Sequence, residues 1–166
     1  VLVYAFELFT KIYEEEGFNT NEIPALILKN NLFGIDIDER AAQLAAFALT
    51  MKARNYYSRF LRKPVQPNVI ALENVSEDII RRSVKLPVKI KGRSIKNYSE
   101  LSLHLLTKAD NFGSLIQIVP EEVEHIKMDE GSIWQEEQEK FINQANYLCK
   151  QYHCVVTNPP YMGGKG

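Results

Sequence analysis

An apolar run that leads directly into a long alanine-rich helix constrains the fold of this 166-residue chain more than any other feature. The run occupies residues 32–37, and the stretch from Ala41 to about Tyr57 repeats its large apolar residues at helical spacing. A second apolar run, residues 67–74, follows the helix. A strand, a helix and another strand in this order are typical of a doubly wound α/β fold.

An acidic residue stands at the carboxyl end of the first predicted strand. A doubly wound α/β fold places a carboxylate there for the two ribose hydroxyls of a nucleotide-like cofactor, and Asp36 occupies this position. The alternative is that Asp36 is a second capping residue or a carboxylate that only faces solvent. Asp38 is expected to cap the following helix.

A further acid ends the second predicted strand. Folds of this class often carry an acid there that faces the adenine amine of the cofactor, and Glu73 occupies the position. Glu73 is therefore a candidate cofactor residue. A glutamate that is simply exposed after a strand is the competing interpretation.

The last residues set a predicted strand, residues 153–157, against Asn158-Pro159-Pro160-Tyr161. Two consecutive prolines fix their own φ at about −65° and remove two backbone donors, so the chain becomes stiff there. The Asn158 side-chain carbonyl and the Pro159 backbone carbonyl can both accept hydrogen bonds from one amino group, and the Tyr161 ring offers a face for stacking. A polar turn after a buried strand is the alternative.

This tetrapeptide resembles the (D/N)PP(Y/F/W) motif of amino methyltransferases, which use S-adenosyl-L-methionine to methylate the exocyclic amine of adenine in DNA. The resemblance implies that Asn158, Pro159 and Tyr161, with Pro160 between them, grip an adenine flipped out of double-stranded DNA. An amine inside the base stack cannot meet the sulfonium methyl group in line. Two carbonyl acceptors favour the more tetrahedral nitrogen of the transition state.

The same resemblance assigns the cofactor residues. It implies that Asp36 binds the ribose of S-adenosyl-L-methionine and that Ile37 packs on its adenine. Protein-glutamine methyltransferases share Asn-Pro-Pro-Tyr, because a glutamine amide is also a planar amine, and they stay an alternative within the enzyme class. A non-catalytic scaffold or interaction module of a defence complex is the alternative outside it.

Three segments extend the resemblance to one family: VLVYAFELFTKIYEEEG, NLFGIDIDERAAQLAAFALTMKAR and NPPYMGGKG. In this order they resemble the large adenine-specific methyltransferases of bacterial phage defence, the PglX type of BREX loci, and the related type IIG restriction-modification enzymes. That family implies a class I, Rossmann-like S-adenosylmethionine-dependent fold. Its glycine-containing loop and central first strand would precede the opening helix, and neither is present here. We therefore expect residues 1–166 to be a partial catalytic domain, inactive in isolation and without a DNA target-recognition domain.

The missing central strand gives a structural expectation. In the family's sheet order it lies between strands 32–37 and 153–157, so these two should not be hydrogen-bonded to each other directly. About eighty residues separate the runs 67–74 and 153–157, whereas a compact connection with its helix needs roughly thirty. We expect a helical insertion at about residues 76–131. Within and after it we expect helices at 76–84, 98–109, from Pro120 and at 134–152, an edge strand at 85–91, and a turn at 110–114.

Composition indicates an ordinary folded protein without a strong nucleic-acid footprint. The chain is 45% apolar and 25% charged, with a net charge of −1. DNA-binding domains usually carry a basic surface, so most DNA recognition is expected elsewhere in a longer parent. One local basic patch could contact phosphates, although a solvated helix end explains it equally: Lys52, Arg54, Arg59, Arg62 and Lys63.

Cysteine and hydropathy patterns exclude other classes. Cys149 and Cys154 lack a CxxC pattern and companion histidines, so we expect buried free thiols and no metal site. No stretch has the length of a membrane span and no signal peptide is seen, so we expect a cytoplasmic location and no membrane partner. DNA and other subunits of a defence system are the expected partners.

Overall fold

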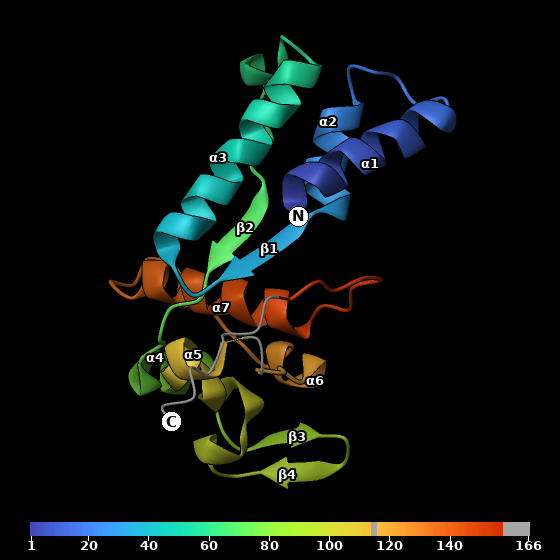
Figure 1. Cartoon of the computed structure of the whole chain (residues 1–166). Coiled ribbons are helices and arrows are strands. Elements are labelled where there is room, and N and C mark those ends of the chain that lie inside the picture. The colour runs from blue at the N-terminus through green and yellow to red at the C-terminus, as the bar shows by residue number, and fades with distance from the viewer. Residues whose placement is uncertain (114–115, 158–166) are drawn as a thin grey trace, which may run out of the picture. The chain divides into compact units, whose positions relative to one another are not determined.

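The computed structural model describes residues 1–113 and 116–157. It divides into two compact units, Val1–Leu72 and Glu73–Gly166, which are described separately below. Each unit combines helices with one small two-stranded sheet, so the chain is mixed α/β (Figure 1). Within the described residues, no helix is both long enough and apolar enough to cross a membrane.

The centre of the first unit is a strand, a helix and a parallel strand. β1 (Phe33–Asp36) pairs with β2 (Asn68–Ala71) in parallel, and α3 (Glu39–Tyr56) connects them and contacts both. This arrangement confirms the predicted strand, helix and strand. No third strand joins this sheet within the described part of the chain.

The start of α3 follows from a local hydrogen-bond pattern. The Asp38 side chain accepts from the backbone N–H of Arg40 at 2.8 Å and of Ala41 at 3.4 Å. These bonds satisfy two donors that a helix start leaves without intrahelical partners. The predicted capping role of Asp38 is therefore confirmed.

The opening segment also forms the predicted helix, α1 (Leu2–Glu15). It ends just before Gly17, whose φ of +78° is a conformation that favours glycine. The short helix α2 (Ile23–Leu26) and the π-helical turn η1 (Ile27–Asn31) then lead into β1. α1 packs on α3, where the Tyr56 hydroxyl donates to Glu14 Oε1 at 2.6 Å and Lys52 forms an ion pair with Glu7.

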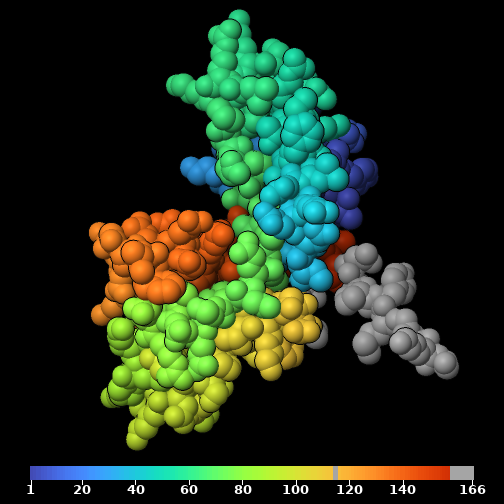
Figure 2. All heavy atoms as spheres, turned by 90° about the vertical axis from the view of Figure 1, so that its left-hand side faces the viewer, coloured from blue at the N-terminus to red at the C-terminus, as the bar shows by residue number. Residues whose placement is uncertain are grey.

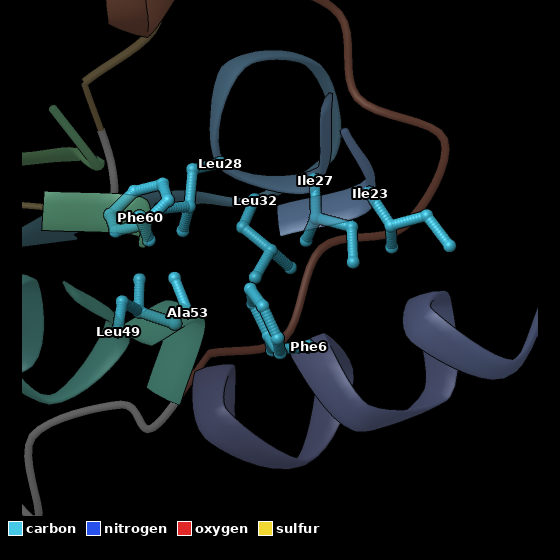
Figure 3. Packing of buried hydrophobic residues seen from close by; sticks show 8 residues of the cluster. All are labelled: Phe6, Ile23, Ile27, Leu28, Leu32, Leu49, Ala53 and Phe60. Atoms are coloured by element: carbon cyan, nitrogen blue, oxygen red, sulfur yellow. The ribbon is translucent and has the colours of Figure 1, made fainter. Parts of the chain in front are cut away.

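One apolar cluster holds the first unit together (Figure 3). It draws on α1, α2, η1, α3 and η2 (Phe60–Arg62), and Phe6 of α1 is only 1% exposed within it. Such burial is the main favourable term in folding a unit of this size. Its members are Phe6, Ile23, Ile27, Leu28, Leu32, Leu49, Ala53 and Phe60.

The second unit consists of short elements around its own core. They are α4 (Glu77–Ser83), β3 (Val88–Ile90), β4 (Arg93–Ile95), η3 (Tyr98–Glu100), η4 (Ser102–Lys108), α5 (Ala109–Phe112), α6 (Pro120–Val123) and α7 (Gln135–Cys149). The helices predicted near 76–84, from Pro120 and within 134–152 are confirmed. The first two and α7 pack together through contacts of α7 with α4 and α6.

Two predictions in this unit need correction. Residues 98–109 form two 3₁₀ segments, η3 and η4, before α5 begins at Ala109, and residues 110–112 continue α5 where a turn was expected. A buried carboxylate explains the break. Glu122, 4% exposed, accepts from the backbone N–H of Ser102 and Leu103 and from the Ser102 hydroxyl, so a new helical segment begins at Ser102.

The predicted edge strand near 85–91 is confirmed as β3, but its partner was not predicted. β3 pairs with β4 in antiparallel fashion, with Val88 opposite Ile95. The two-residue loop between them has positive φ at both positions, +47° at Lys91 and +80° at Gly92. Such loops match the twist of a hairpin. Gly92 directly after the alternating run was the sequence signal.

A buried glutamine ties α7 to its surroundings in the second unit. Gln138 is 0% exposed, and its amide donates to Ser83 Oγ of α4 at 3.1 Å while its carbonyl accepts from Asp129 N at 3.1 Å. Both polar ends are therefore satisfied, as a buried amide requires.

The strand predicted at residues 153–157 is wrong within the described structure. This segment has no strand conformation, and Val155 and Val156 are 68% and 67% exposed. A strand needs a neighbour for its backbone N–H and C=O groups, and no described segment pairs with this one. Because residues 153–157 form no strand, the expectation about their pairing with run 32–37 stays a prediction.

Candidate cofactor-binding edge

The carboxyl edge of the β1–β2 sheet presents an acid and an apolar residue together. Asp36 is the last residue of β1, and its backbone carbonyl accepts from Leu72 N at 2.7 Å. β1 and β2 therefore end at the same edge. The Asp36 side chain is exposed and the neighbouring Ile37 is 58% exposed. In parallel α/β sheets, ligands bind at this edge.

The Asp36 carboxylate is oriented by its own turn. Its Oδ1 accepts from Asp38 N at 2.9 Å, which closes a local turn between β1 and α3. Its Oδ2 has no hydrogen-bond partner among the described residues. The Asp36 side chain thus accepts from the backbone of the N-cap residue, whereas the first-turn N–H groups of Arg40 and Ala41 bond to Asp38. A turn-fixed carboxylate with one oxygen still open to solvent fits a ribose, and this role stays a prediction.

An apolar surface accompanies this carboxylate. Ile35 of β1 is 39% exposed, and Ile37 follows Asp36 directly. Exposed isoleucines next to a carboxylate that can bind a sugar suit a ligand with a polar sugar and an aromatic base, because each part finds matching chemistry. The packing of Ile37 on an adenine remains a prediction as well.

Gly34 lets the opening helix approach the sheet closely, and sequence reasoning did not single it out. A Cβ atom at this position would lie 3.2 Å from Leu2 Cδ1 and 3.2 Å from Val69 Cγ1. These distances are tighter than ordinary carbon contacts. The glycine inside an otherwise apolar run was the available signal.

Glu73 belongs to the second unit and is held by α7. Its backbone N–H donates to Gln144 Oε1 at 2.9 Å, and its carboxylate lies 3.7 Å from Lys140 Nζ. Both side chains of this ion pair are about half exposed, so the pair stabilises the unit little. The backbone bond fixes the main chain at this position whatever the side chain, and the predicted cofactor role of Glu73 stays a prediction.

The predicted target-base residues lie outside the described residues. They are Asn158, Pro159, Pro160 and Tyr161. Their assignment therefore rests on the sequence.

The two cysteines lie nearer the surface than expected. Cys149 and Cys154 are free, as predicted, but they are half-buried and exposed where burial was expected. Partial burial raises the pKa of the Cys149 thiol, which reduces its reactivity at neutral pH. Among the described side chains, no group of histidine, cysteine and acidic residues could hold a metal ion.

The predicted basic patch lies at the far end of α3 from Asp36. Arg59, Arg62 and Lys63 line a cavity of about 340 Å³ together with Asn21 and Tyr57. An 18-residue helix is about 27 Å long, so this hollow is remote from the carboxyl edge of the sheet within the same unit.

Comparisons with known proteins give a consistent result. The sequence profile of the family described as "Eco57I restriction-modification methylase" matches residues 30–166. The chain is 38% identical over 198 residues to "Adenine-specific methyltransferase BrxX" of Escherichia coli O9:H4 (strain HS), covering 100% of this chain and 16% of that protein. It is 31% identical over 176 residues to "Adenine-specific methyltransferase PglX" of Lacticaseibacillus casei (strain Zhang), covering 98% of this chain and 15% of that protein. The chain thus spans about a sixth of the length of these relatives.

Proposed function

Because the chain belongs to the Eco57I restriction-modification methylase family, we propose that it contributes cofactor-binding and target-base-binding residues to an adenine-specific DNA methyltransferase. The reaction transfers a methyl group from S-adenosyl-L-methionine to the exocyclic N6 amine of adenine. The observation that carries this proposal is the turn-fixed, exposed Asp36 carboxylate at the carboxyl edge of a β1–α3–β2 unit. Both named relatives are adenine-specific methyltransferases, which favours DNA adenine over a protein glutamine as the acceptor.

The arrangement of the first unit supports a Rossmann-like fold for the complete domain. α1 and α3 pack on each other, and α3 crosses between two parallel strands. In the proposed fold a further strand, supplied by a longer parent, pairs with the outer edge of β1. The exposed Val155-Val156 run then pairs with that strand, which is why we propose that the isolated chain is inactive.

Asp36 and Ile37 would act on the donor. One Asp36 oxygen is used to hold the turn through Asp38 N, and the other accepts a ribose hydroxyl hydrogen. Ile37 offers an apolar face beside it for the adenine ring. Together they orient the cofactor, whose sulfonium group supplies an activated methyl group.

Asn158 and Pro159 would act on the acceptor. Two carbonyl oxygens that accept from the same amino group would concentrate its lone pair on nitrogen. This would favour attack of the amine on the methyl carbon as the bond from that carbon to sulfur breaks, with the thioether as leaving group and the extra amine proton released to solvent. Tyr161 stacks on the extruded base, and the consecutive prolines fix the oxygens in place. Glu73 would be a further acid near the adenine of the cofactor.

Cofactor binding tests the first half of this proposal. S-adenosyl-L-methionine is titrated calorimetrically into the chain extended upstream by about thirty residues, the size of one βα unit, and into its Asp36→Ala variant. We expect the variant to bind at least tenfold more weakly. The matched control is Asp38→Ala, which removes the helix cap two residues away and should lower stability without a comparable loss of affinity. Equal cofactor affinity of the Asp36 variant and the unchanged protein would refute the assignment.

Methyl transfer tests the second half. In the DNA-methylating parent, Asn158→Ala is expected to abolish methylation and leave the affinity for S-adenosyl-L-methionine nearly unchanged. Methylation is measured as transfer of a tritiated methyl group to duplex DNA. An Asn158→Ala protein with full activity would contradict the proposed role of the tetrapeptide.

A further inference from the structure

The β3–β4 hairpin and its flanks form a basic stretch without acidic residues. Between Asp78 and Glu100 the sequence has seven basic residues and no acidic residue. The whole chain has only 20 basic residues and a net charge of −1. A third of its positive charge is therefore concentrated in one eighth of its length, and this concentration requires a structural or functional reason.

The hairpin separates its apolar and basic side chains onto two faces. Val88, Ile90 and Ile95 are buried against the core of the second unit. Side chains alternate along a strand, so Lys89 of β3 and Lys96 just after β4 lie on the outward face. Both are exposed, and so is Lys85 ahead of β3. The buried face fixes the hairpin, and the outward face is left to solvent.

Four of the seven cations have partners among the described residues, and the other three form no ion pair there. Arg93 is paired with Glu100 at 3.0 Å, and Arg81 is paired with Glu77 and stacks on a tyrosine ring. Arg82 stacks on an indole ring, and Lys91 Nζ lies 3.8 Å from a carboxylate oxygen of the half-buried Glu121. The three remaining cations form no ion pair among the described residues, and they are Lys85, Lys89 and Lys96. These three side chains, here called the hairpin lysines, are available to an anionic partner.

We propose that the hairpin lysines bind the phosphodiester backbone of the DNA substrate. This inference rests on the proposed function and identifies the surface that would hold the substrate. Lysine ammonium groups are point charges without the fork of arginine, so they suit phosphate oxygens better than base edges. The contact would therefore position the duplex and not read its sequence.

The path of the chain supports this partner. The chain leaves the first unit at the carboxyl edge of the β1–β2 sheet, where Leu72 N donates to the Asp36 carbonyl, and the second unit begins at Glu73. The unit that carries the hairpin therefore follows the proposed cofactor-binding edge directly in the chain. Lysines on exposed strands also prevent strand pairing with other chains, but that role predicts no effect on DNA affinity.

The test is the salt dependence of DNA binding by the chain. Fluorescence anisotropy is measured for two 20-base-pair duplexes of unrelated sequence between 50 and 200 mM salt. The hairpin variant carries Lys85→Gln, Lys89→Gln and Lys96→Gln. The salt slope is the steepness with which the logarithm of the affinity falls with the logarithm of the salt concentration, and loss of three phosphate contacts lowers it by up to about 2.7. The unchanged chain should then lose up to about 40-fold more affinity than the hairpin variant across this salt range, equally for both duplexes.

The chain offers a control of equal charge. The control variant carries Lys11→Gln, Lys29→Gln and Lys108→Gln, three exposed lysines outside both the hairpin and the predicted basic patch. It changes the net charge by the same amount as the hairpin variant. We expect its salt slope to stay close to that of the unchanged chain. Circular dichroism of both variants verifies that the fold is retained.

Several outcomes would overturn the proposal. They are an unchanged slope in the hairpin variant, an equal loss in the control variant, and absence of duplex binding by the unchanged chain at 50 mM salt. Binding of poly-L-glutamate as tight as that of the duplex would indicate an acidic protein partner instead. Failure of the cofactor test at Asp36 with an intact slope effect would remove the proposed function and leave the hairpin as a nucleic-acid contact.

Discussion

Replacing Glu122 by glutamine tests how the second unit is assembled. The Glu122 carboxylate is 4% exposed and accepts three hydrogen bonds. Oε1 accepts from Ser102 N at 2.9 Å, and Oε2 accepts from Ser102 Oγ at 2.9 Å and from Leu103 N at 3.0 Å. The Ser102 hydroxyl oxygen in turn accepts from Val119 N at 2.9 Å. One buried side chain therefore fixes the start of η4 and the segment before α6.

The loss of stability expected for Glu122→Gln follows from the number of hydrogen-bond acceptors that remain at this position. A glutamine at position 122 keeps one oxygen, which can still serve the two donors now bound to Oε2. Its amide nitrogen would face Ser102 N–H, so one buried donor loses its acceptor. An unsatisfied buried donor costs about 1–3 kcal/mol. Glu122→Ala removes all three acceptors and should cost more than Glu122→Gln.

The only tryptophan of the chain gives a specific assay. Trp134 belongs to the second unit, where Arg82 stacks on its ring at 5.0 Å, so its fluorescence reports the unfolding of this unit. Urea unfolding followed at Trp134 gives the change in the free energy of unfolding. Glu124→Gln, an exposed glutamate of the same segment, is the matched control. A Glu122→Gln protein as stable as this control, within about 0.5 kcal/mol, would refute the reasoning.

Three further predictions concern single positions. Gly34→Ala should destabilise the first unit by about 1 kcal/mol, measured by urea unfolding followed by circular dichroism, because its Cβ would crowd side chains of α1 and β2; an unchanged midpoint would contradict this. Gly92→Ala should destabilise the second unit by about 1 kcal/mol, because alanine is strained at φ +80°. Lys91→Asn, at φ +47°, should stabilise the hairpin. The midpoint of urea unfolding of each variant is measured by Trp fluorescence, and midpoints equal to that of the unchanged protein would contradict the turn assignment. Burial and the hydrogen bond to Glu14 raise the pKa of Tyr56 to about 12. The neutral phenol therefore stabilises the first unit fully below pH 10.0, the ordinary pKa of tyrosine, and this stabilisation is lost as the pH rises toward 12. Burial also raises the pKa of Tyr147 and Tyr152, so the Tyr56 contribution to the high-pH absorbance is identified as the part that Tyr56→Phe removes. That part should shift earlier in Glu14→Gln, and no shift would exclude this hydrogen bond.

Local features of the first unit were predictable because they depend on neighbouring residues. The Asp38 cap needs only the two backbone N–H groups that follow it, and the position of Asp36 after an apolar run needs only the strand itself. The close approach at Gly34 was not predictable in the same way. It depends on Leu2, more than thirty positions away in the chain.

Features of the second unit depended on distant partners to a greater degree. The Ser102 start of η4 depends on a carboxylate twenty positions later, and the buried Gln138 depends on Ser83, fifty-five positions earlier. Helical periodicity predicts neither contact. For this reason the sequence favoured one helix over residues 98–109 where the structure has two 3₁₀ segments and the start of α5.

The amino-acid sequence alone determined the order of strand, helix and strand, the capping residue, the acid at the strand end and the family resemblance, since each is encoded within a short stretch. Only the tertiary structure decided which strands pair. Val155 and Val156 have the composition of a strand, yet they lie exposed because no described segment satisfies their backbone groups. Residues 93–95 were not predicted as a strand, yet they form one because β3 lies beside them. Strand formation requires a partner, and a partner is a property of the fold.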